Sequence, residues 1–139
     1  MVLLIDTNIL LDVLQVREPH FKFSLKIWGL CDYDDSITGY ISSMSFVNLA
    51  YVMRKELTPD RMQEMYMTLV STFKIINLQE EDLNSAVNMK WRDFEDAVQS
   101  AIASRIKADY IITRNVKDFQ GSKTSAISPE DYFTNVFII

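Results

Sequence analysis

The sequence is poor in residues that break helices and in residues that cross-link chains. Its 139 residues include only 3 glycines, 3 prolines and 1 cysteine. So few glycines and prolines disfavour a turn-rich all-β fold and favour long helices. Cys31 has no partner for an internal disulfide, which indicates a reducing cytoplasm as the location. Because the one histidine, His20, lies in another segment, we interpret Cys31 as a core residue and not as a nucleophile.

Long apolar runs and an excess of positive charge are also missing. No stretch is long enough to cross a membrane, and residues 2–5 end at Asp6 with no basic residue before them. We therefore expect neither a membrane helix nor a signal peptide. The net charge is −5, whereas a protein that holds nucleic acid by phosphate neutralisation alone is normally basic. If the chain acts on RNA or DNA, a metal ion must supply positive charge at the phosphate.

The sequence does contain enough apolar surface for one packed domain, expected to cover residues 1–139. Hydrophobic residues make up 48% of the chain, a content that argues against disorder. Continuous apolar runs predict buried strands at residues 2–5, 37–41, 73–76, 110–113 and 125–127. Helices are predicted after Asp6, after Pro19, at 44–55, from Pro59, at 82–90, from Phe94 and from Ser128. This alternation predicts a three-layer α/β/α sandwich with a mostly parallel sheet.

Polar side chains follow two of the predicted strands, and two acids begin a later helix. In an open parallel sheet, these positions meet at the carboxyl ends of the strands, where ligands bind. Taken singly, each acid has a simpler interpretation as a helix cap, a partner of the helix dipole or a loop residue. Taken together, clustered carboxylates repel one another unless a cation is bound, and oxygen ligands without His or Cys favour Mg²⁺ or Mn²⁺. The candidates are Asp6, Asn8, Glu95, Asp96, Thr113, Asn115 and Asp118.

Four segments resemble the motifs of PIN domains, in the family's order and over nearly the whole chain. They are LLIDTNILL (3–11), FEDAVQSAIA (94–103), ADYIITRNVKDF (108–119) and ISPEDYF (127–133). The resemblance implies a three-layer α/β/α fold and Mg²⁺- or Mn²⁺-dependent cleavage of RNA. It also implies a VapC-like toxin that pairs with an antitoxin protein, and members of this kind often form homodimers.

Matching the motifs residue by residue assigns roles to the candidates. The resemblance places Asp6, Asp96 and Asp118 in the acidic pocket, as catalytic and metal-binding residues. Thr113 and Asn115 match its polar support and its fourth position, and Asn8 matches a residue that holds the first loop. Arg114 is the nearest candidate to bind RNA. Weaker candidates for RNA contact are Arg54, Lys55 and Arg92.

One position departs from the family pattern. In the segment SMSFVNLAY (43–51), Asn48 stands where the family usually places a glutamate. Either Asn48 supports the pocket with one negative charge fewer, or it is a structural asparagine with buried partners. Glu95 is a candidate replacement charge, although neighbouring residues on a helix point about 100° apart.

Three other functions therefore remain open beside the ribonuclease. A non-catalytic PIN-like module would bind RNA or a protein partner, and Asn48 favours it. A nuclease with the same pocket would cut DNA instead. A different Mg²⁺-carboxylate protein, such as a phosphotransfer receiver, fits least because it would need adjacent acids after the first strand.

Overall fold

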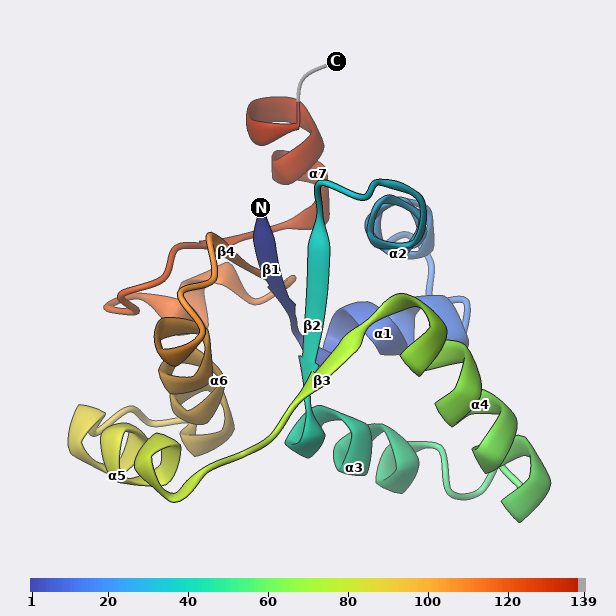
Figure 1. Ribbon diagram of the computed structural model, residues 1–139, viewed down its shortest axis with the longest axis horizontal. Helices are drawn as coiled ribbons and strands as arrows, with labels where there is room; N and C mark the ends of the chain where they lie inside the picture. The colour runs from blue at the N-terminus through green and yellow to red at the C-terminus, as the bar shows by residue number, and fades with distance from the viewer. Residues whose placement is uncertain (138–139) are drawn as a thin grey trace.

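Five parallel strands form one sheet in the computed structural model, which describes residues 1–137 (Figure 1). Their order across the sheet is β3–β2–β1–β4–β5, so β1 lies at the centre. The strands are β1 (Val2–Ile5), β2 (Thr38–Ser42), β3 (Lys74–Ile76), β4 (Tyr110–Ile112) and β5 (Ala126–Ile127). Leu3 pairs with Gly39 on one side and with Tyr110 on the other. Burial on both faces explains why β1 is a continuous apolar run.

Helices cover both faces of the sheet, and the predicted three-layer α/β/α sandwich is confirmed (Figure 1). On one side lie α1 (Thr7–Leu14), α2 (Phe21–Tyr33) and α4 (Pro59–Thr72), and on the other α5 (Glu80–Met89) and α6 (Phe94–Arg105). The remaining helical elements are α3 (Ser43–Val52), the 3₁₀-helix η1 (Val116–Phe119), α7 (Pro129–Asp131) and the π-helix η2 (Tyr132–Val136). Within residues 1–137, none of these helices has the length and hydrophobicity needed to span a bilayer.

The two faces of β1 supply two separate hydrophobic cores, because successive strand residues point to opposite sides. Leu3 and Ile5 pack with the helices α1, α2 and α4. Leu4 packs with α5 and α6, where Ala97 and Ile102 are completely buried. The sheet is therefore anchored from both sides, and the carboxyl ends of its strands are held in fixed positions.

Side-chain caps fix the helix starts at that edge of the sheet. Asp6 accepts a hydrogen bond from the Thr7 amide at 2.8 Å as α1 begins. Ser42 ends β2 and accepts from the amide of Ser45 at 3.0 Å in α3. Such caps satisfy backbone amides that have no partner within the helix. They make each strand-to-helix turn short, so polar residues stay at the strand ends.

Several predicted boundaries differ from those observed. The strand predicted at 37–41 runs from Thr38 to Ser42, and the helix predicted at 44–55 is α3, which ends at Val52 in a turn. The strand predicted at 73–76 begins at Lys74, because Phe73 caps α4 and its side chain is buried. The helix predicted at 82–90 begins at Glu80, because Gln79 and Asp82 form a capping box. The shifted starts of β3 and α5 come from caps, which the apolar pattern does not reveal.

Cys31 is buried in the core, as its isolation in the sequence predicts. Burial raises its pKa to about 12, so the thiol stays protonated near neutral pH. It packs against Gly39, where an added Cβ would lie 2.7 Å from Cys31 Sγ and 2.9 Å from Phe73 Cδ1. Gly39 thus allows α2 to approach β2 closely.

Candidate active site

A polar cleft of about 400 Å³ lies at the carboxyl end of β1, between α1, α3 and the start of α6. Asp6 follows β1 directly, and the first turn of α6 faces it across the cleft. The lining holds four carboxylates and no Lys, Arg or His. The lining residues are Asp6, Thr7, Asn8, Leu11, Asn48, Tyr51, Val52, Asp93, Glu95, Asp96 and Asn115.

Asp6 is buried and held by neutral donors. Its Oδ1 accepts from the Thr7 amide at 2.8 Å, and its Oδ2 accepts from Thr113 Oγ1 at 2.8 Å. Longer hydrogen bonds of 3.4 Å come from the side-chain amides of Asn8 and Gln99. Burial raises the pKa of Asp6 and outweighs the hydrogen bonds from Thr113, Thr7 and Gln99, which lower it, while the charge of Asp93 raises it further. The structure thus fixes the direction of this carboxylate and leaves its charge uncompensated.

Gln99, which donates to Asp6, and Ser45, which accepts from Gln99, support this carboxylate. Neither residue is among the site residues that the sequence predicts. Gln99 Nε2 donates to Ser45 Oγ at 2.8 Å, and Thr7 Oγ1 donates to the same oxygen at 2.9 Å. Both Gln99 and Ser45 are completely buried. A signal was available for Gln99, since it is a polar residue within the apolar stripe of α6, three positions after Asp96. Such a residue must find polar partners inside the protein.

Asp96, at the start of α6, is a strongly perturbed carboxyl group of the cleft. Burial raises its pKa to about 7, helped by the negative charges of Asp6, Asp93, Asp118 and Glu95. Near neutral pH, Asp96 therefore either keeps a proton or needs a cation nearby.

The pKa of Glu95 is also raised, first by burial and then by the charge of Asp6. The Asn48 amide partly offsets this rise. Asn48 and Glu95 thus lie close together in the cleft. The Asn48 amide stabilises the ionised form of Glu95, the residue that the sequence suggests as a replacement charge.

Most of the predicted site residues come together in this cleft. Asp6, Asn8, Asn48, Glu95, Asp96 and Asn115 line it. Thr113 lies behind Asp6, is completely buried, and also accepts a hydrogen bond from the Asn115 amide at 3.0 Å.

Asp118 and Arg114 lie outside the cleft lining. The 3₁₀-helix η1 places Asp118 in an adjacent hollow with Trp91 and Arg92, although its charge still raises the pKa of Asp96. Arg114 donates from Nε to Asp12 Oδ2 at 2.8 Å, so part of its guanidinium is engaged in an ion pair.

Asp93 is the acidic residue that the sequence reasoning missed. It caps α6 by accepting from the Asp96 amide at 3.1 Å, and its charge raises the pKa of Asp6, Glu95 and Asp96. The signal was its spacing, because an aspartate three residues before another acid at a helix start is a typical N-cap. The apolar stripe predicts a helix from Phe94 onward and gives Asp93 no role.

The donors of the cleft suit a hard divalent cation. Within residues 1–137, no three His, Cys, Asp or Glu side chains lie close enough together to form a ready-made metal cluster. Mg²⁺, however, is commonly bound by one or two carboxylates and keeps several waters. Asp6 and Asp96, with the amide oxygen of Asn115 nearby, provide such an oxygen-only set. Zn²⁺ would instead require His or Cys ligands, which the cleft lacks.

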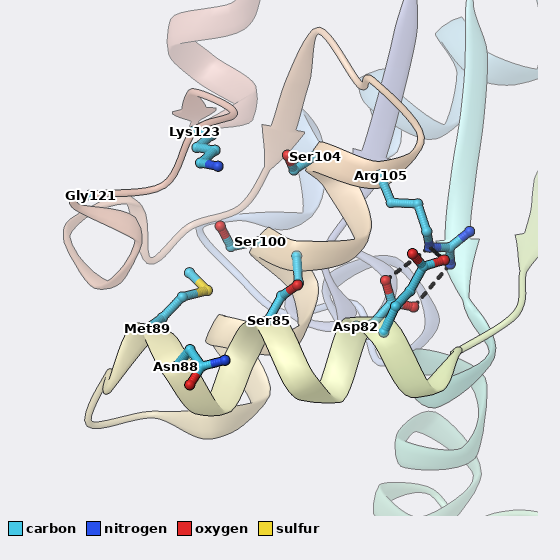
Figure 2. Close-up of a pocket in the computed structure, with 11 residues that line it drawn as sticks. Asp82, Ser85, Asn88, Met89, Ser100, Ser104, Arg105, Gly121 and Lys123 are labelled. Atoms are coloured by element: carbon cyan, nitrogen blue, oxygen red, sulfur yellow. Dashed lines mark hydrogen bonds and ion pairs between the residues drawn. The ribbon is translucent and has the colours of Figure 1, made fainter.

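A larger hollow of about 550 Å³ lies between α5, α6 and the segment from Gly121 to Lys123 (Figure 2). Serine hydroxyls line much of it, and Ser100 Oγ is hydrogen-bonded to Ser122 Oγ at 2.7 Å. Arg105 at one end is paired with Asp82 through bonds of 2.8 and 3.0 Å, drawn as dashed lines in Figure 2. The two carboxylates that line this hollow, Glu81 and Asp82, are both paired with Arg105, unlike those in the cleft around Asp6, so size alone does not make it the reactive site.

The fold and the cleft define an α/β protein with a carboxylate-lined site at the carboxyl end of its central strand. A family model for the PIN domain matches residues 2–117. The chain therefore belongs to the PIN-domain family, and the resemblance seen in its motifs is confirmed.

Solved structures of the same fold cover most of the chain. A toxin–antitoxin complex from Klebsiella pneumoniae has 26% sequence identity and a TM-score of 0.69, covering 91% of this chain and 96% of that one. VapBC-1 from nontypeable Haemophilus influenzae has 14% identity and a TM-score of 0.71, with coverages of 94% and 99%. VapC20 from Mycobacterium tuberculosis, a sarcin–ricin-loop-cleaving toxin, has 9% identity and a TM-score of 0.63, with coverages of 78% and 86%. No curated protein sequence matched the chain.

Proposed function

We propose that this chain is a Mg²⁺- or Mn²⁺-dependent endoribonuclease that hydrolyses RNA phosphodiester bonds. The observation that carries the proposal is a contrast among its buried aspartates. Asp12 and Asp82 each form an ion pair with an arginine at 2.8 Å. Asp6 and Asp96 are buried as well, yet within residues 1–137 neither is paired with a basic side chain. Uncompensated charge in an open cleft favours a bound divalent cation.

In this proposal Asp6 and Asp96 hold the cation. A divalent ion bound there would lower the pKa of a coordinated water and neutralise charge on the scissile phosphate. Thr113 and Gln99 keep Asp6 oriented, and Asn115 offers a further oxygen at the rim. Asp118 lies outside the cleft but close enough to raise the pKa of Asp96, which supports a contribution through water.

We further propose that the chain is the toxin of a toxin–antitoxin pair, acting on RNA in the cytoplasm and bound by an antitoxin protein. Two similar structures, from Klebsiella pneumoniae and Haemophilus influenzae, are toxin–antitoxin or VapBC assemblies. The Mycobacterium tuberculosis neighbour, VapC20, is a sarcin–ricin-loop-cleaving toxin. Homodimer formation is part of the same proposal and would be measured by light scattering of the purified chain.

Cleavage by matched variants tests the enzyme proposal. The parent chain should cut single-stranded RNA with Mg²⁺ or Mn²⁺ and stop when the metal is chelated. Asp6→Asn and Asp96→Asn should lose most activity while they stay folded, because each removes one of the two proposed ligands. Asp12→Asn is an unsuitable control since its carboxylate is buried and paired, so Asp60→Asn on the exposed start of α4 serves instead. Equal rates for the parent and both site variants would reject the proposal.

Asn48 supports a second candidate, a non-catalytic PIN-like module that binds RNA or a protein. It lines the cleft where the family pattern places a glutamate, so the cleft has one charge fewer. Calorimetric titration with Mn²⁺ separates the two candidates. An enzyme should bind the ion in an Asp6- and Asp96-dependent way, whereas a non-catalytic module should show weak binding that these substitutions leave unchanged.

A further inference from the structure

Tyr51 is an exposed aromatic residue at the rim of the acidic cleft. It lies in the last turn of α3, lines the cleft that contains Asp6 and Asp96, and is 66% exposed. Its ring is therefore accessible to a ligand at the edge of a polar cleft.

Arg54 covers one face of this ring. Its Cζ lies 4.0 Å from the ring centroid, and its Nη1 donates to the Tyr51 carbonyl oxygen at 2.7 Å. The hydrogen bond holds the guanidinium in place, which limits the freedom of a side chain that is otherwise exposed. Since Arg54 occupies one face and the residue is largely exposed, the opposite face remains accessible to a planar ligand.

We propose that Tyr51 and Arg54 form a stacking platform for a nucleobase of single-stranded RNA, next to the scissile phosphate. An aromatic ring backed by a guanidinium is a surface on which bases of any identity stack. Arg54 also adds positive charge beside a cleft whose lining has none, and the phosphate that follows the stacked base needs such charge. This inference rests on the proposed ribonuclease function and describes how the cleft around Asp6 and Asp96 would bind its substrate.

The platform explains how an acidic chain could hold RNA. The net charge is −5, and the cleft around Asp6 is lined by carboxylates. Stacking does not depend on net charge, so it supplies affinity that phosphate contacts alone would not provide here. Exposed Val52, beside Tyr51 on the same rim, extends the apolar part of this surface.

Binding to a base-bearing RNA and to an abasic oligomer tests the proposal. Both probes are short single strands of equal length, and the second has the ribose–phosphate backbone without bases. Fluorescence anisotropy is measured in the Asp96→Asn chain, so that the RNA is bound but not cut. This chain should prefer the base-bearing strand, and Tyr51→Leu should weaken that strand's binding about tenfold while the abasic strand is unaffected. Tyr51→Phe keeps the ring and should bind like the parent.

Matched controls isolate the role of the ring and of the guanidinium. Tyr33→Leu removes a tyrosine that is 85% exposed at the opposite end of the sheet, and it should change nothing. Arg54→Met should weaken the binding of both probes, whereas Arg61→Met, on the exposed surface of α4, should not.

Several outcomes would overturn the platform. It is wrong if the Asp96→Asn chain does not prefer base-bearing RNA, or if Tyr51→Leu weakens both probes equally. It is also wrong if Tyr51→Leu leaves RNA binding intact but abolishes binding of an antitoxin protein, which would assign this rim to a protein interface. If the parent cuts no RNA yet Tyr51→Leu removes the base preference, the ribonuclease function fails while the platform stands.

Discussion

The ion pair between Asp12 and Arg114 offers a quantitative test of how the site is held together. Asp12 is completely buried in α1, and Arg114 lies between Thr113, which donates to Asp6, and Asn115, which lines the cleft. Arg114 Nε donates to Asp12 Oδ2 at 2.8 Å, and Ser24 Oγ of α2 donates to the same oxygen at 2.9 Å. These bonds therefore connect α1 and α2 to the segment after β4. That segment also contains Thr113, which donates to Asp6.

Arg114→Met should destabilise the fold strongly, because it leaves the Asp12 carboxylate buried without its counter-charge. Breaking a buried pair from one side costs about 3–5 kcal/mol. We expect about 3 kcal/mol, near the lower end of that range, because the Arg114 side chain is 25% exposed and water can partly replace it. Within residues 1–137, Asp12 Oδ1 is buried without a hydrogen-bond partner, so Asp12 has little other compensation.

Urea-induced unfolding of a double-mutant cycle measures this energy. Asp12→Asn removes the charge but keeps an oxygen for Ser24 Oγ, so the double variant should recover about 2 kcal/mol of the loss caused by Arg114→Met. A coupling below about 0.5 kcal/mol, the usual limit of additivity, would refute the reasoning. The cycle also tests the sequence prediction that Arg114 binds RNA. An RNA contact would change the Kd for RNA with little effect on the free energy of unfolding.

Three further predictions concern the cleft and the core. The Asp96 pKa of about 7 lies above its unfolded value of 3.8, so the folded state binds more protons and loses stability as pH rises from about 4 to 7. Asp96→Asn should remove that loss and raise the free energy of unfolding at pH 8, without metal, by roughly 1–3 kcal/mol. If the pH dependence of unfolding is the same in the variant as in the parent, the charge of Asp96 is not buried as described. Asp93→Ser keeps the N-cap of α6 but removes a charge, so NMR titration should show a lower pKa for Asp96; an unchanged value would mean that Asp93 does not act on it. Gly39→Ala should cost about 1–3 kcal/mol in thermal unfolding through its clash with Cys31 Sγ, and Cys31→Ala in the same chain should restore part of it. No recovery in that double variant would place the strain elsewhere.

The sequence predicts the sheet well because its central strands are buried on both faces. Residues 2–5 and 110–112 are continuous apolar runs followed by polar residues, and both are strands, although β4 ends at Ile112, one residue before the predicted end at 113. Strand order does not follow from such runs, because it depends on which crossover each helix takes. The order β3–β2–β1–β4–β5 is what brings Thr113, after β4, beside Asp6, after β1.

What the sequence did not predict is the placement of Asp118 and the roles of Asp93 and Gln99, which depend on a short helix, a helix cap and a buried amide. Asp118 follows β4 closely in sequence, yet a four-residue 3₁₀-helix turns it into a neighbouring hollow. No periodicity marks so short a helix. Asp93 acts through a helix cap, and Gln99 acts through its buried amide. Apolar spacing identifies the buried face of a helix and predicts neither role.

The structure separates buried aspartates that have an arginine partner from those that have none among the described residues, and the sequence alone cannot make this distinction. Burial of a carboxylate is costly unless a counter-charge or hydrogen bonds stabilise it. Asp12 and Asp82 have arginines, so their burial is explained by the fold itself. Within the described residues 1–137, Asp6 has only neutral donors, and Asp96 faces further carboxylates, so the fold does not by itself account for their burial. A bound cation would supply the counter-charge that Asp6 and Asp96 lack. Tyr51 lies at the rim of the same cleft, and the face of its ring opposite Arg54 is the proposed surface for a base. The proposed chemistry and the proposed base stacking thus point to the same cleft from independent residues.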